Sequence, residues 1–179
     1  MPNLQTAVFG GGCFWCLEAV FQRLPGVKSV ESGYMGGNVE NPTYKEVCTG
    51  TTGHTEVVRI TYDPAQVSYR DLLDVFFTVH DPTTLNRQGN DAGTQYRSVI
   101  FYESDEQQRE AKQVIADLTA AHEWPDPIVT AVESAGTFFR AEGYHQDYYN
   151  QNPSQPYCRY IIAPKVEKFQ KVFAERLKA

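Results

Sequence analysis

The sequence predicts an α+β fold, a two-layer sandwich in which helices pack on one mixed sheet. Three observations support this class. Strand-like and helix-like segments interleave along the chain, some strands follow one another directly, and no internal repeat or Pro/Gly/Ser-rich linker divides the sequence. With 179 residues the chain can bury one substantial core. We therefore expect a single domain over residues 1–179, with residues 150–179 as a C-terminal tail.

Each element follows from hydrophobic periodicity. Strands are indicated where side chains alternate between two faces, or where β-branched and aromatic residues cluster between turn signals. These segments are residues 4–10, 27–37, 54–64, 96–102 and 127–134. Helices are indicated where apolar residues recur three and four positions apart. These segments are residues 13–24, 68–82, 104–122 and a last helix that begins at Pro164.

The residues at the helix ends support these limits. Pro25 and Gly26 end the first helix. Ser68 and Ser104 suit the N-cap positions of the next two helices, and Pro164 suits the first turn of the last. Each helix thus has a local signal for at least one of its ends.

Composition and charge exclude several function classes. The formal net charge is -6, and no basic cluster offers a surface to nucleic acid or an anionic membrane. No apolar run approaches the roughly 20 residues needed to span a bilayer, and the N-terminus lacks the regions of a secretory signal. We expect a cytoplasmic protein that binds neither nucleic acid nor membrane, and nothing in the sequence demands more than a monomer.

Four cysteines, Cys13, Cys16, Cys48 and Cys158, raise the question of redox or metal chemistry. A chain of this size needs no disulfide staples. A zinc site usually takes four ligands from two paired motifs, whereas only one Cys-x-x-Cys pair is present, so we expect no metal. Cys13 and Cys16 fit either a thioredoxin-like dithiol or a single thiolate that is oxidised and then resolved by another cysteine. Cys48 is interpreted as a packed structural cysteine.

Cys13 has the position of a reactive thiol. It follows three glycines at the start of the first helix, where unpaired N–H groups and the helix dipole favour a thiolate. The glycines would let another molecule approach the backbone closely. The plainer alternative, a buried filler beside a tight turn, stays open at this point. A phosphate-binding loop is a weaker alternative, because neither glycine fingerprint for phosphate is present.

Six sequence blocks stand out: GCFWC, SGYMGG, NPTYKEVCTGTTGHTEVVRITYDP, HDPTT, RQGNDAGTQYRS and GYHQDYYNQNP. In this order they resemble the peptide methionine sulfoxide reductases of the A type, over most of the chain from Gly10 to Cys158. The resemblance implies a ferredoxin-like core and an enzyme that reduces the S epimer of methionine sulfoxide, free or in oxidised proteins. It also implies that neither a metal nor a bound organic cofactor takes part.

The resemblance assigns roles by motif. Cys13 of GCFW is the nucleophile, and Phe14 and Trp15 form the wall that receives the substrate methyl group. Glu56 of GHTE is the general acid. The residues support Glu56 in part, since it shares a strand face with Val58, and a carboxyl buried there would hold its proton near neutral pH. Without the resemblance, a glutamate that points from a strand end into water is the favoured interpretation.

Three further residues take their roles from the resemblance alone. Tyr44 of NPTY and Tyr96 of TQYRS match its helper tyrosines, and Asp91 of GND matches an aspartate of the substrate pocket. All three lie in turn-rich segments, where surface polar residues and functional ones are both common. His54 and His145 also fall in these blocks, and we interpret both as hydrogen-bonded structural histidines.

The resolving thiol is where the sequence departs from the commonest pattern of the family. Many relatives have glycine at position 16 and resolve with cysteines in a glycine-rich tail, whereas here the position holds Cys16 and the tail holds only Cys158. Cys158 matches the tail resolver by its place after NQNP, so we expect it to pair first with Cys13. Cys16 is then the second relay thiol or the alternative resolver, since it is close enough in the chain to pair with Cys13. The family implies thioredoxin as the final reductant.

Two other function classes stay open on the sequence. Cys13 and Cys16 fit a thiol–disulfide oxidoreductase, and the aromatic residues fit a module that binds oxidised methionine without turnover. Consumption of a methyl sulfoxide distinguishes the first class from a reductase. A change in protein mass after one equivalent of substrate distinguishes the second.

Overall fold

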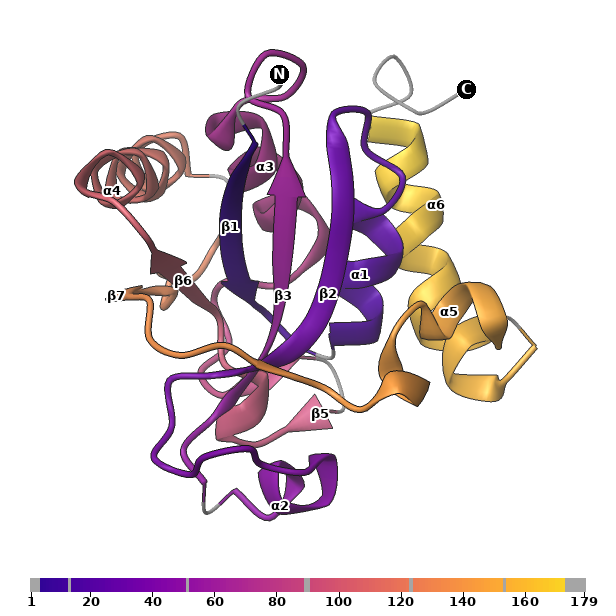
Figure 1. The fold of residues 1–179 in the computed structure, drawn as a ribbon. Coiled ribbons are helices and arrows are strands. Elements are labelled where there is room, and N and C mark those ends of the chain that lie inside the picture. The colour runs from indigo at the N-terminus through magenta and orange to yellow at the C-terminus, as the bar shows by residue number, and fades with distance from the viewer. Residues whose placement is uncertain are drawn as a thin grey trace.

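The computed structural model describes residues 4–12, 14–50, 52–88, 91–122, 124–152 and 154–172, apart from the side chains of Asp91, Tyr144 and Val172. Within these residues, the centre of the fold is a six-stranded mixed sheet with the strand order β7-β6-β1-β3-β2-β8 (Figure 1). Its strands are β1 (Gln5–Gly10), β2 (Val27–Met35), β3 (Thr55–Tyr62), β6 (Val99–Tyr102), β7 (Ala131–Ser134) and β8 (Phe139–Arg140). Cys13, the expected nucleophile, lies outside the described residues.

The four inner strands and two of the helices form a ferredoxin-like unit. The pairs β6–β1, β1–β3 and β3–β2 are antiparallel, while β7 is parallel to β6. Helix α1 (Phe14–Phe21) lies between β1 and β2 in the chain, and α3 (Tyr69–Val79) lies between β3 and β6. This βαββαβ order confirms the α+β class and matches the ferredoxin-like core that the resemblance implied.

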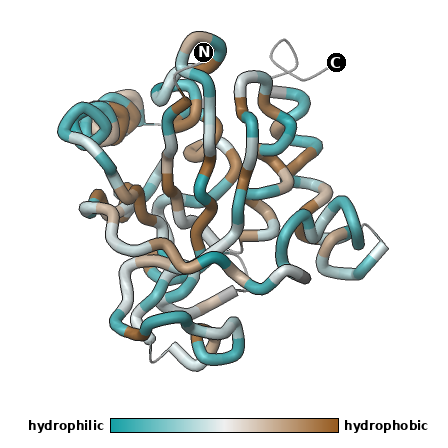
Figure 2. Tube along the Cα trace, in the orientation of Figure 1, coloured by the Kyte–Doolittle hydropathy of each residue, from teal (hydrophilic) through white to brown (hydrophobic). Residues whose placement is uncertain are grey.

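Helices cover one face of the sheet. α1, α3 and α6 (Ala163–Val172) contact one another, and Figure 1 shows them behind the central strands. The main core lies between these helices and the sheet, and Phe9, Phe21 and Phe76 are among its fully buried side chains. Figure 2 shows hydrophobic residues concentrated in the central strands and the adjoining helices, as burial of apolar surface requires.

The opposite face of the sheet carries a smaller apolar cluster. Its buried members are Val8, Met35, Val57, Val99 and Phe101, and the residues packed on them are Ala131, Ala135 and Phe138. The segment that follows β7 crosses this face toward β8 (Figure 1). Both faces of the central strands are therefore covered, which explains why β3 is buried on both sides near its start.

The helix caps that the sequence predicts are present. Ser68 Oγ accepts a hydrogen bond from Asp71 N–H at 3.0 Å, and Asp71 accepts one from Ser68 N–H at 3.1 Å, which completes a capping box. Ser104 Oγ accepts from Gln107 N–H at 3.2 Å at the start of α4 (Asp105–Ala120). Such caps satisfy N–H groups that a helix leaves without partners, so they set where α3 and α4 begin.

Several short elements do not follow from periodicity, because a few residues are too short a window to show any. They are α2 (Tyr44–Cys48), β4 (Arg87–Gln88), β5 (Asp91–Ala92), η1 (Thr94–Tyr96), η2 (Gly143–His145) and α5 (Tyr148–Gln151). β7 is shorter than the strand predicted over 127–134. One reason is that Val129 N–H donates to the Pro82 carbonyl at 2.7 Å instead of to a neighbouring strand.

The last helix begins earlier than the sequence predicts. A π-helical turn, Cys158–Ile162, runs directly into α6, so Pro164 lies inside a continuous helical segment and the predicted start at Pro164 was wrong. Proline cannot donate a backbone hydrogen bond, and its ring crowds the carbonyl one turn earlier. The wider π turn, in which Ala163 N–H donates to the Cys158 carbonyl, accommodates both effects. Cys158 therefore lies on a helical turn that contacts α1.

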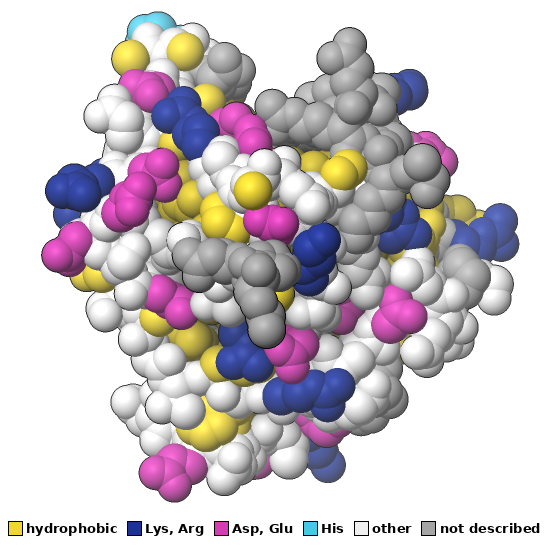
Figure 3. Space-filling view, turned by 45° about the horizontal axis from the view of Figure 1, so that its top comes forward, with side chains coloured by type: hydrophobic (Ala, Val, Ile, Leu, Met, Phe, Trp, Pro, Cys, Tyr) yellow, Lys and Arg dark blue, Asp and Glu magenta, His cyan; other side chains and the backbone are white. Residues whose placement is uncertain are grey.

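The helices and the surface of the described residues bear on binding to membranes and nucleic acid. No helix in the described ranges is both long and apolar enough to cross a bilayer. On the face seen in Figure 3, acidic and basic side chains are interspersed. That face therefore offers no extended positive surface to nucleic acid.

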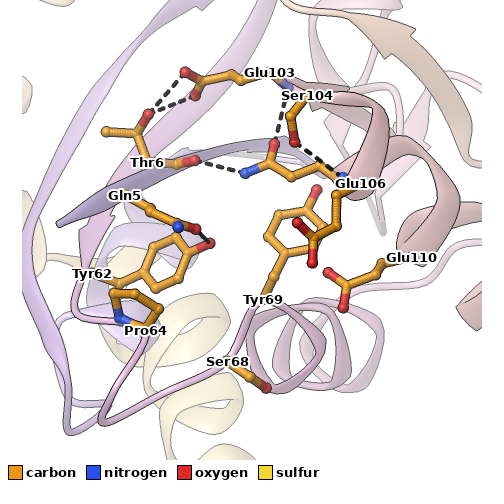
Figure 4. A pocket seen from close by; sticks show the side chains of 11 residues that line it. Gln5, Thr6, Tyr62, Pro64, Ser68, Tyr69, Glu103, Ser104, Glu106 and Glu110 are labelled. Atoms are coloured by element: carbon orange, nitrogen blue, oxygen red, sulfur yellow. Dashed lines mark hydrogen bonds between the residues drawn. The ribbon is translucent and has the colours of Figure 1, made fainter. Parts of the chain in front are cut away.

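A cavity of about 510 Å³ lies at the end of the sheet where β1 begins and β3 ends (Figure 4). Its wall includes Tyr62, Tyr69, Glu103, Glu106 and Glu110. The Thr6 hydroxyl hydrogen-bonds to both Glu103 carboxylate oxygens at 2.8 Å, as Figure 4 shows. None of the candidate site residues whose side chains the structure describes lines this cavity. The candidate site lies instead at the other end of β1.

Candidate active site

The site is built around the glycine run that follows β1. Gly12 has a φ of 86°, a conformation suited to glycine, and its N–H donates to the Tyr96 carbonyl at 3.2 Å. Gly11 is buried, and a Cβ there would lie 2.9 Å from the His80 ring. The protein's own side chains occupy the space at Gly11. This corrects the expectation that the glycines open the backbone to another molecule.

The Glu56 carboxyl lies at the first turn of α1. Glu56 is fully buried on β3, and its Oε1 accepts a hydrogen bond from Phe14 N–H at 3.1 Å. Cys13 directly precedes Phe14 in the sequence. The interpretation favoured by the sequence alone, a glutamate in water, was wrong. Strand alternation places Glu56 on the same buried face as Val58, and α1 packs over that face.

Phe14 and Trp15 belong to an aromatic enclosure. Phe14 is fully buried, so Trp15, which is half-buried, is the one of the pair that presents surface. The Trp15 ring stacks on Tyr148 with centroids 3.9 Å apart and planes inclined by 10°. Its Nε1 donates to His145 Nδ1 at 3.1 Å. These contacts hold the indole in one orientation, as a wall for an apolar group requires.

His145 is a buried, neutral ring within this enclosure. Burial lowers its pKa, and the nearby charge of Glu142 opposes that shift only in part. Because Nδ1 accepts from Trp15, the proton of the neutral ring lies on Nε2. His54 is likewise held by backbone groups, an N–H at 3.0 Å and a carbonyl at 2.6 Å. Both histidines are hydrogen-bonded within the fold, as the sequence interpretation expected.

Tyr44, the first residue of α2, reaches the site through its ring. Its centroid lies 4.5 Å from that of His145 and 6.3 Å from that of Trp15. Burial, followed by the charges of Glu56 and Tyr96, raises the pKa of Tyr44 above its ordinary value. Tyr44 therefore keeps its proton and can donate a hydrogen bond near Glu56. The fold thus brings Tyr44, Glu56 and Tyr96 together from three separate elements.

The side chains of two expected site residues, Cys13 and Asp91, lie outside the described part of the structure. Cys13 lies outside the described residues, and Asp91 is described only by its backbone, which pairs with Gln88 in the short β4–β5 hairpin. The role of each stays a prediction. Elsewhere in the described ranges, no group of three or more His, Cys, Asp or Glu side chains is placed to hold a metal ion.

Glu142 belongs to the site, although the sequence does not single it out. Its Oε1 accepts from the Tyr34 hydroxyl and its Oε2 from Tyr44 N–H, both at 3.1 Å. Burial acts to raise the pKa of Glu142, but the hydrogen bonds to its carboxylate outweigh burial and lower it. A charged Glu142 therefore anchors the start of α2. Its position directly before the GYHQDYYNQNP block is the one signal that could have marked it.

Comparison with known proteins identifies the family. Residues 5–177 match the family model described as peptide methionine sulfoxide reductase. The chain belongs to this family. The ordered blocks of the sequence and the buried Glu56 beside α1 agree with that membership.

Curated relatives extend the match over nearly the whole chain. The chain is 57% identical over 173 residues to the peptide methionine sulfoxide reductase MsrA of Polynucleobacter asymbioticus, which covers 97% of this chain and 91% of that protein. It is 55% identical over 174 residues to MsrA of Deinococcus radiodurans, with 97% and 84% covered.

Solved structures share the fold. Mxr1 from Saccharomyces cerevisiae in reduced form is 34% identical with a TM-score of 0.79, over 87% of this chain and 89% of that one. Methionine sulfoxide reductase A of Corynebacterium diphtheriae is 38% identical with a TM-score of 0.76, over 87% and 78%. Mxr1 is also known in complex with Trx2, in a structure that matches at 23% identity and a TM-score of 0.56.

In this methionine sulfoxide reductase the two candidate resolving thiols both lie in the main core. Cys16 on α1 is 2% exposed, and Cys158 in the π turn is fully buried. Burial, and then the nearby Cys16, raises the pKa of Cys158. The Lys165 Nζ donates to Cys16 Sγ at 3.6 Å, and the Tyr157 hydroxyl lies 4.0 Å from the same sulfur. The two thiols are therefore neighbours in different electrostatic settings.

Cys48 is not the packed cysteine that the sequence predicts. It is exposed at the end of α2, where Val47 is the buried residue. A helix of five residues has only one narrow side against the core. Val47 occupies that side, and Cys48 lies at the exposed end of α2, where its thiol is within hydrogen-bond reach of the Tyr44 side chain.

Proposed function

We propose that this protein reduces the S epimer of methionine sulfoxide, free or in oxidised proteins, with Cys13 as the nucleophile. The observation that carries the proposal is the buried Glu56 carboxyl, which accepts the Phe14 N–H at 3.1 Å, one residue after Cys13. Tyr44 and Trp15 add a protonated phenol and an apolar ring to the same enclosure. An enclosure that combines proton donors with an apolar wall suits a substrate with both an S=O group and a methyl thioether.

The first step transfers oxygen from the substrate to Cys13. The thiolate attacks the sulfoxide sulfur and Glu56 donates a proton to the sulfoxide oxygen, which Tyr44 and Tyr96 hold by hydrogen bonds. The S–O bond of the substrate and the transient bond between the two sulfurs then break as the oxygen passes to the Cys13 sulfur, so methionine leaves and Cys13 becomes a sulfenic acid. Two electrons pass from the thiol sulfur to the substrate, so the thiol itself is the reductant of this step. Phe14, Trp15 and Asp91 shape the pocket.

A second thiol then completes the oxidative half of the cycle. It condenses with the sulfenic acid, so that a disulfide forms and water leaves. Cys158 and Cys16 are the two candidates for this step. An external dithiol reduces the disulfide by exchange, and we propose thioredoxin for that role. The complex of Mxr1, a relative at 34% identity, with Trx2 supports this choice.

We also propose that residues 1–179 act as one catalytic domain, monomeric and cytoplasmic, with residues 150–179 as the tail that carries Cys158. Contacts of α6 and the π turn with α1 support the attachment of this tail to the rest of the domain. The cycle requires a reduced dithiol partner, which supports a reducing compartment. Size-exclusion chromatography with light scattering tests the monomer.

A single turnover with the reduced protein tests the function. One equivalent of a peptide that carries either the S or the R epimer is added, and methionine formation and protein thiols are followed together. We expect only the S epimer to be reduced, with one disulfide formed per methionine. Cys13→Ser should form no methionine, while Cys158→Ser, which keeps the nucleophile, should still form one methionine per protein. Binding without reduction would indicate a recognition module, and disulfide exchange without sulfoxide consumption would indicate an oxidoreductase.

A further inference from the structure

Cys16 has a cationic neighbour. Lys165 extends from α6 to α1, where its Nζ donates to Cys16 Sγ at 3.6 Å. The Tyr157 hydroxyl, 4.0 Å away, is a second polar group at this sulfur. In the described part of the chain, Cys158 has no such contact with a lysine or arginine. Its pKa is raised by burial and by Cys16, with no cation among the causes.

Among the described residues, no carboxylate competes with Cys16 for Lys165. In the described ranges the salt bridges involve arginines, so Lys165 forms none with a carboxylate. Its side chain lines a cavity of about 810 Å³ between α3 and α6. The titratable groups that share this wall are His80, Asp81, Tyr157, Tyr160 and Lys168. Burial lowers the pKa of His80 to about 4, so His80 is uncharged at neutral pH. Asp81 is the one acidic residue among the described residues of this wall.

We propose that Lys165 is a positioning residue that holds Cys16 as a thiolate, so that Cys16 attacks the Cys13 sulfenic acid before Cys158 does. A cation beside a thiol favours the thiolate, which is the attacking species in disulfide formation. Cys16 is three residues from Cys13 in the sequence, close enough in the chain for the two sulfurs to pair. The inference rests on the proposed function, because it concerns the step after oxygen transfer. It reverses the order that the sequence leads us to expect.

The step balances without an outside reagent. The Cys16 sulfur attacks the sulfenic sulfur of Cys13, the S–S bond forms and the S–O bond breaks. Cys16 has already lost its proton to solvent as a thiolate, and the departing hydroxyl group takes one proton from solvent and leaves as water. Cys158 then attacks the Cys16 sulfur, so that Cys16 and Cys158 become the disulfide and Cys13 returns as a thiol. The proximity of Cys158 to Cys16 suits this exchange, and the new disulfide passes to the external dithiol.

A spectroscopic titration tests the thiolate directly. In a protein with Cys13, Cys48 and Cys158 replaced by serine, the ultraviolet absorbance of the Cys16 thiolate is followed against pH. Lys165→Met should move this titration to higher pH, and Lys165→Arg should restore it because the charge returns. Lys168→Met, on the same helix and the same cavity wall, is the matched control and should leave it in place. Equal titrations in the parent and in Lys165→Met would overturn the proposal.

A single turnover separates this inference from the proposed function. With one equivalent of S-sulfoxide peptide at neutral pH, Lys165→Met should slow disulfide formation about tenfold, as the thiolate fraction falls, and should affect methionine release less. The slowed step should recover as the pH rises. Failure of the wild-type protein to release methionine would defeat the proposed function itself. Methionine release with disulfide formation unslowed in Lys165→Met would defeat only the role of Lys165.

A separate experiment tests whether Cys16 or Cys158 is the first to attack the Cys13 sulfenic acid. Cys158→Ser should still form the Cys13–Cys16 disulfide at about the wild-type rate, detected by peptide mapping after an acid quench. Cys16→Ser should accumulate the sulfenic acid, which a dimedone probe captures. If Cys158→Ser accumulates the sulfenic acid instead, Cys158 is the first resolver and the proposed order is wrong.

Discussion

At the residue scale, the Glu56 carboxyl lies in surroundings that differ from those of a glutamate in water. It is fully buried and accepts the Phe14 N–H, and burial likewise keeps the nearby Tyr44 phenol protonated. Burial of carboxyls and phenols is a common way for enzymes to keep proton donors at neutral pH. The pair can thus supply both a proton and a hydrogen bond to one oxygen atom of a substrate.

Glu56→Gln tests the proton donor. The amide keeps an oxygen that can accept the Phe14 N–H, but it has no acidic proton to donate. We expect sulfenic acid formation to slow by about 10²–10⁴-fold, the usual contribution of general acid catalysis. Rapid-quench measurement of a single turnover gives this rate, and circular dichroism checks the fold. An unchanged rate would remove Glu56 from the mechanism.

Tyr44→Phe tests the hydrogen bond to the sulfoxide oxygen. The ring and its contact with His145 are retained, while the hydroxyl is lost. We expect the first step to slow by about 10–10²-fold. This is a smaller effect than if Tyr44 were the only hydrogen-bond donor, because Tyr96 still holds the sulfoxide oxygen. The double variant with Tyr96→Phe should be slower than either single variant. A double variant as fast as Tyr44→Phe alone would show that Tyr96 makes no such contact.

At the element scale, α2 is a five-residue helix that positions Tyr44. A helix of this length is not stable by itself, so its ends must be held by other groups. Thr43 Oγ1 accepts from Glu46 N–H at 3.1 Å and Glu46 accepts from Thr43 N–H at 3.0 Å, which forms a capping box. Glu142 adds its hydrogen bond from Tyr44 N–H. The cap and Glu142 together determine where the phenol lies.

Removal of two equivalent caps should therefore have different consequences. Thr43→Ala and Ser68→Ala each remove a cap worth about 1 kcal/mol. Thr43→Ala should raise KM with little change in the global free energy of unfolding, because α2 can open locally. Ser68 caps the core helix α3. Ser68→Ala should therefore lower the global free energy of unfolding by about 1 kcal/mol and leave KM unchanged. Urea denaturation and steady-state kinetics measure both, and a KM unchanged in Thr43→Ala would contradict the role of α2.

At the scale of the whole molecule, His80 connects the helical layer to the sheet. Its Nδ1 donates to the Phe76 carbonyl, and its Nε2 accepts from the Ser98 hydroxyl, which in turn accepts from Thr130 at 2.7 Å. Burial lowers the pKa of His80 to about 4, the Phe76 carbonyl opposes this shift, and Lys165 adds to it. The folded protein therefore holds a neutral imidazole that the unfolded chain would protonate in mild acid.

This difference makes stability depend on pH. Between the unfolded pKa of 6.5 and the folded value of about 4, only the unfolded state binds the proton. The contribution of His80 to the free energy of unfolding is at its full value above about pH 6.5. As the pH falls from there toward 4, the free energy of unfolding decreases by roughly 3 kcal/mol in total. His80→Asn should flatten the free energy of unfolding across this window, while the exposed His122→Asn should not. Urea denaturation at a series of pH values measures the slope, and an unchanged slope in His80→Asn would contradict this account.

The main elements could be predicted from the sequence, because periodicity and caps act over a few residues. The alternation of residues 54–64 placed Glu56 on the face of Val58, and Ser68 marked the start of α3. The start at Pro164 was wrong, because a π turn, which has no sequence signature of its own, lets the helix pass through this proline. The prediction that Cys48 is packed in the core was wrong, because a helix as short as α2 shows no hydrophobic periodicity in the sequence.

The sequence by itself determined the α+β class, the order of the main elements and, through six ordered blocks, the family of this chain. Only the tertiary structure decided how the site is surrounded. The Phe14–Glu56 hydrogen bond joins residues 42 positions apart, and the Lys165–Cys16 contact joins residues 149 apart. Contacts over such separations depend on how the elements pack, and no local pattern records them. The burial of Glu56 and the cation beside Cys16 therefore became visible only in the fold.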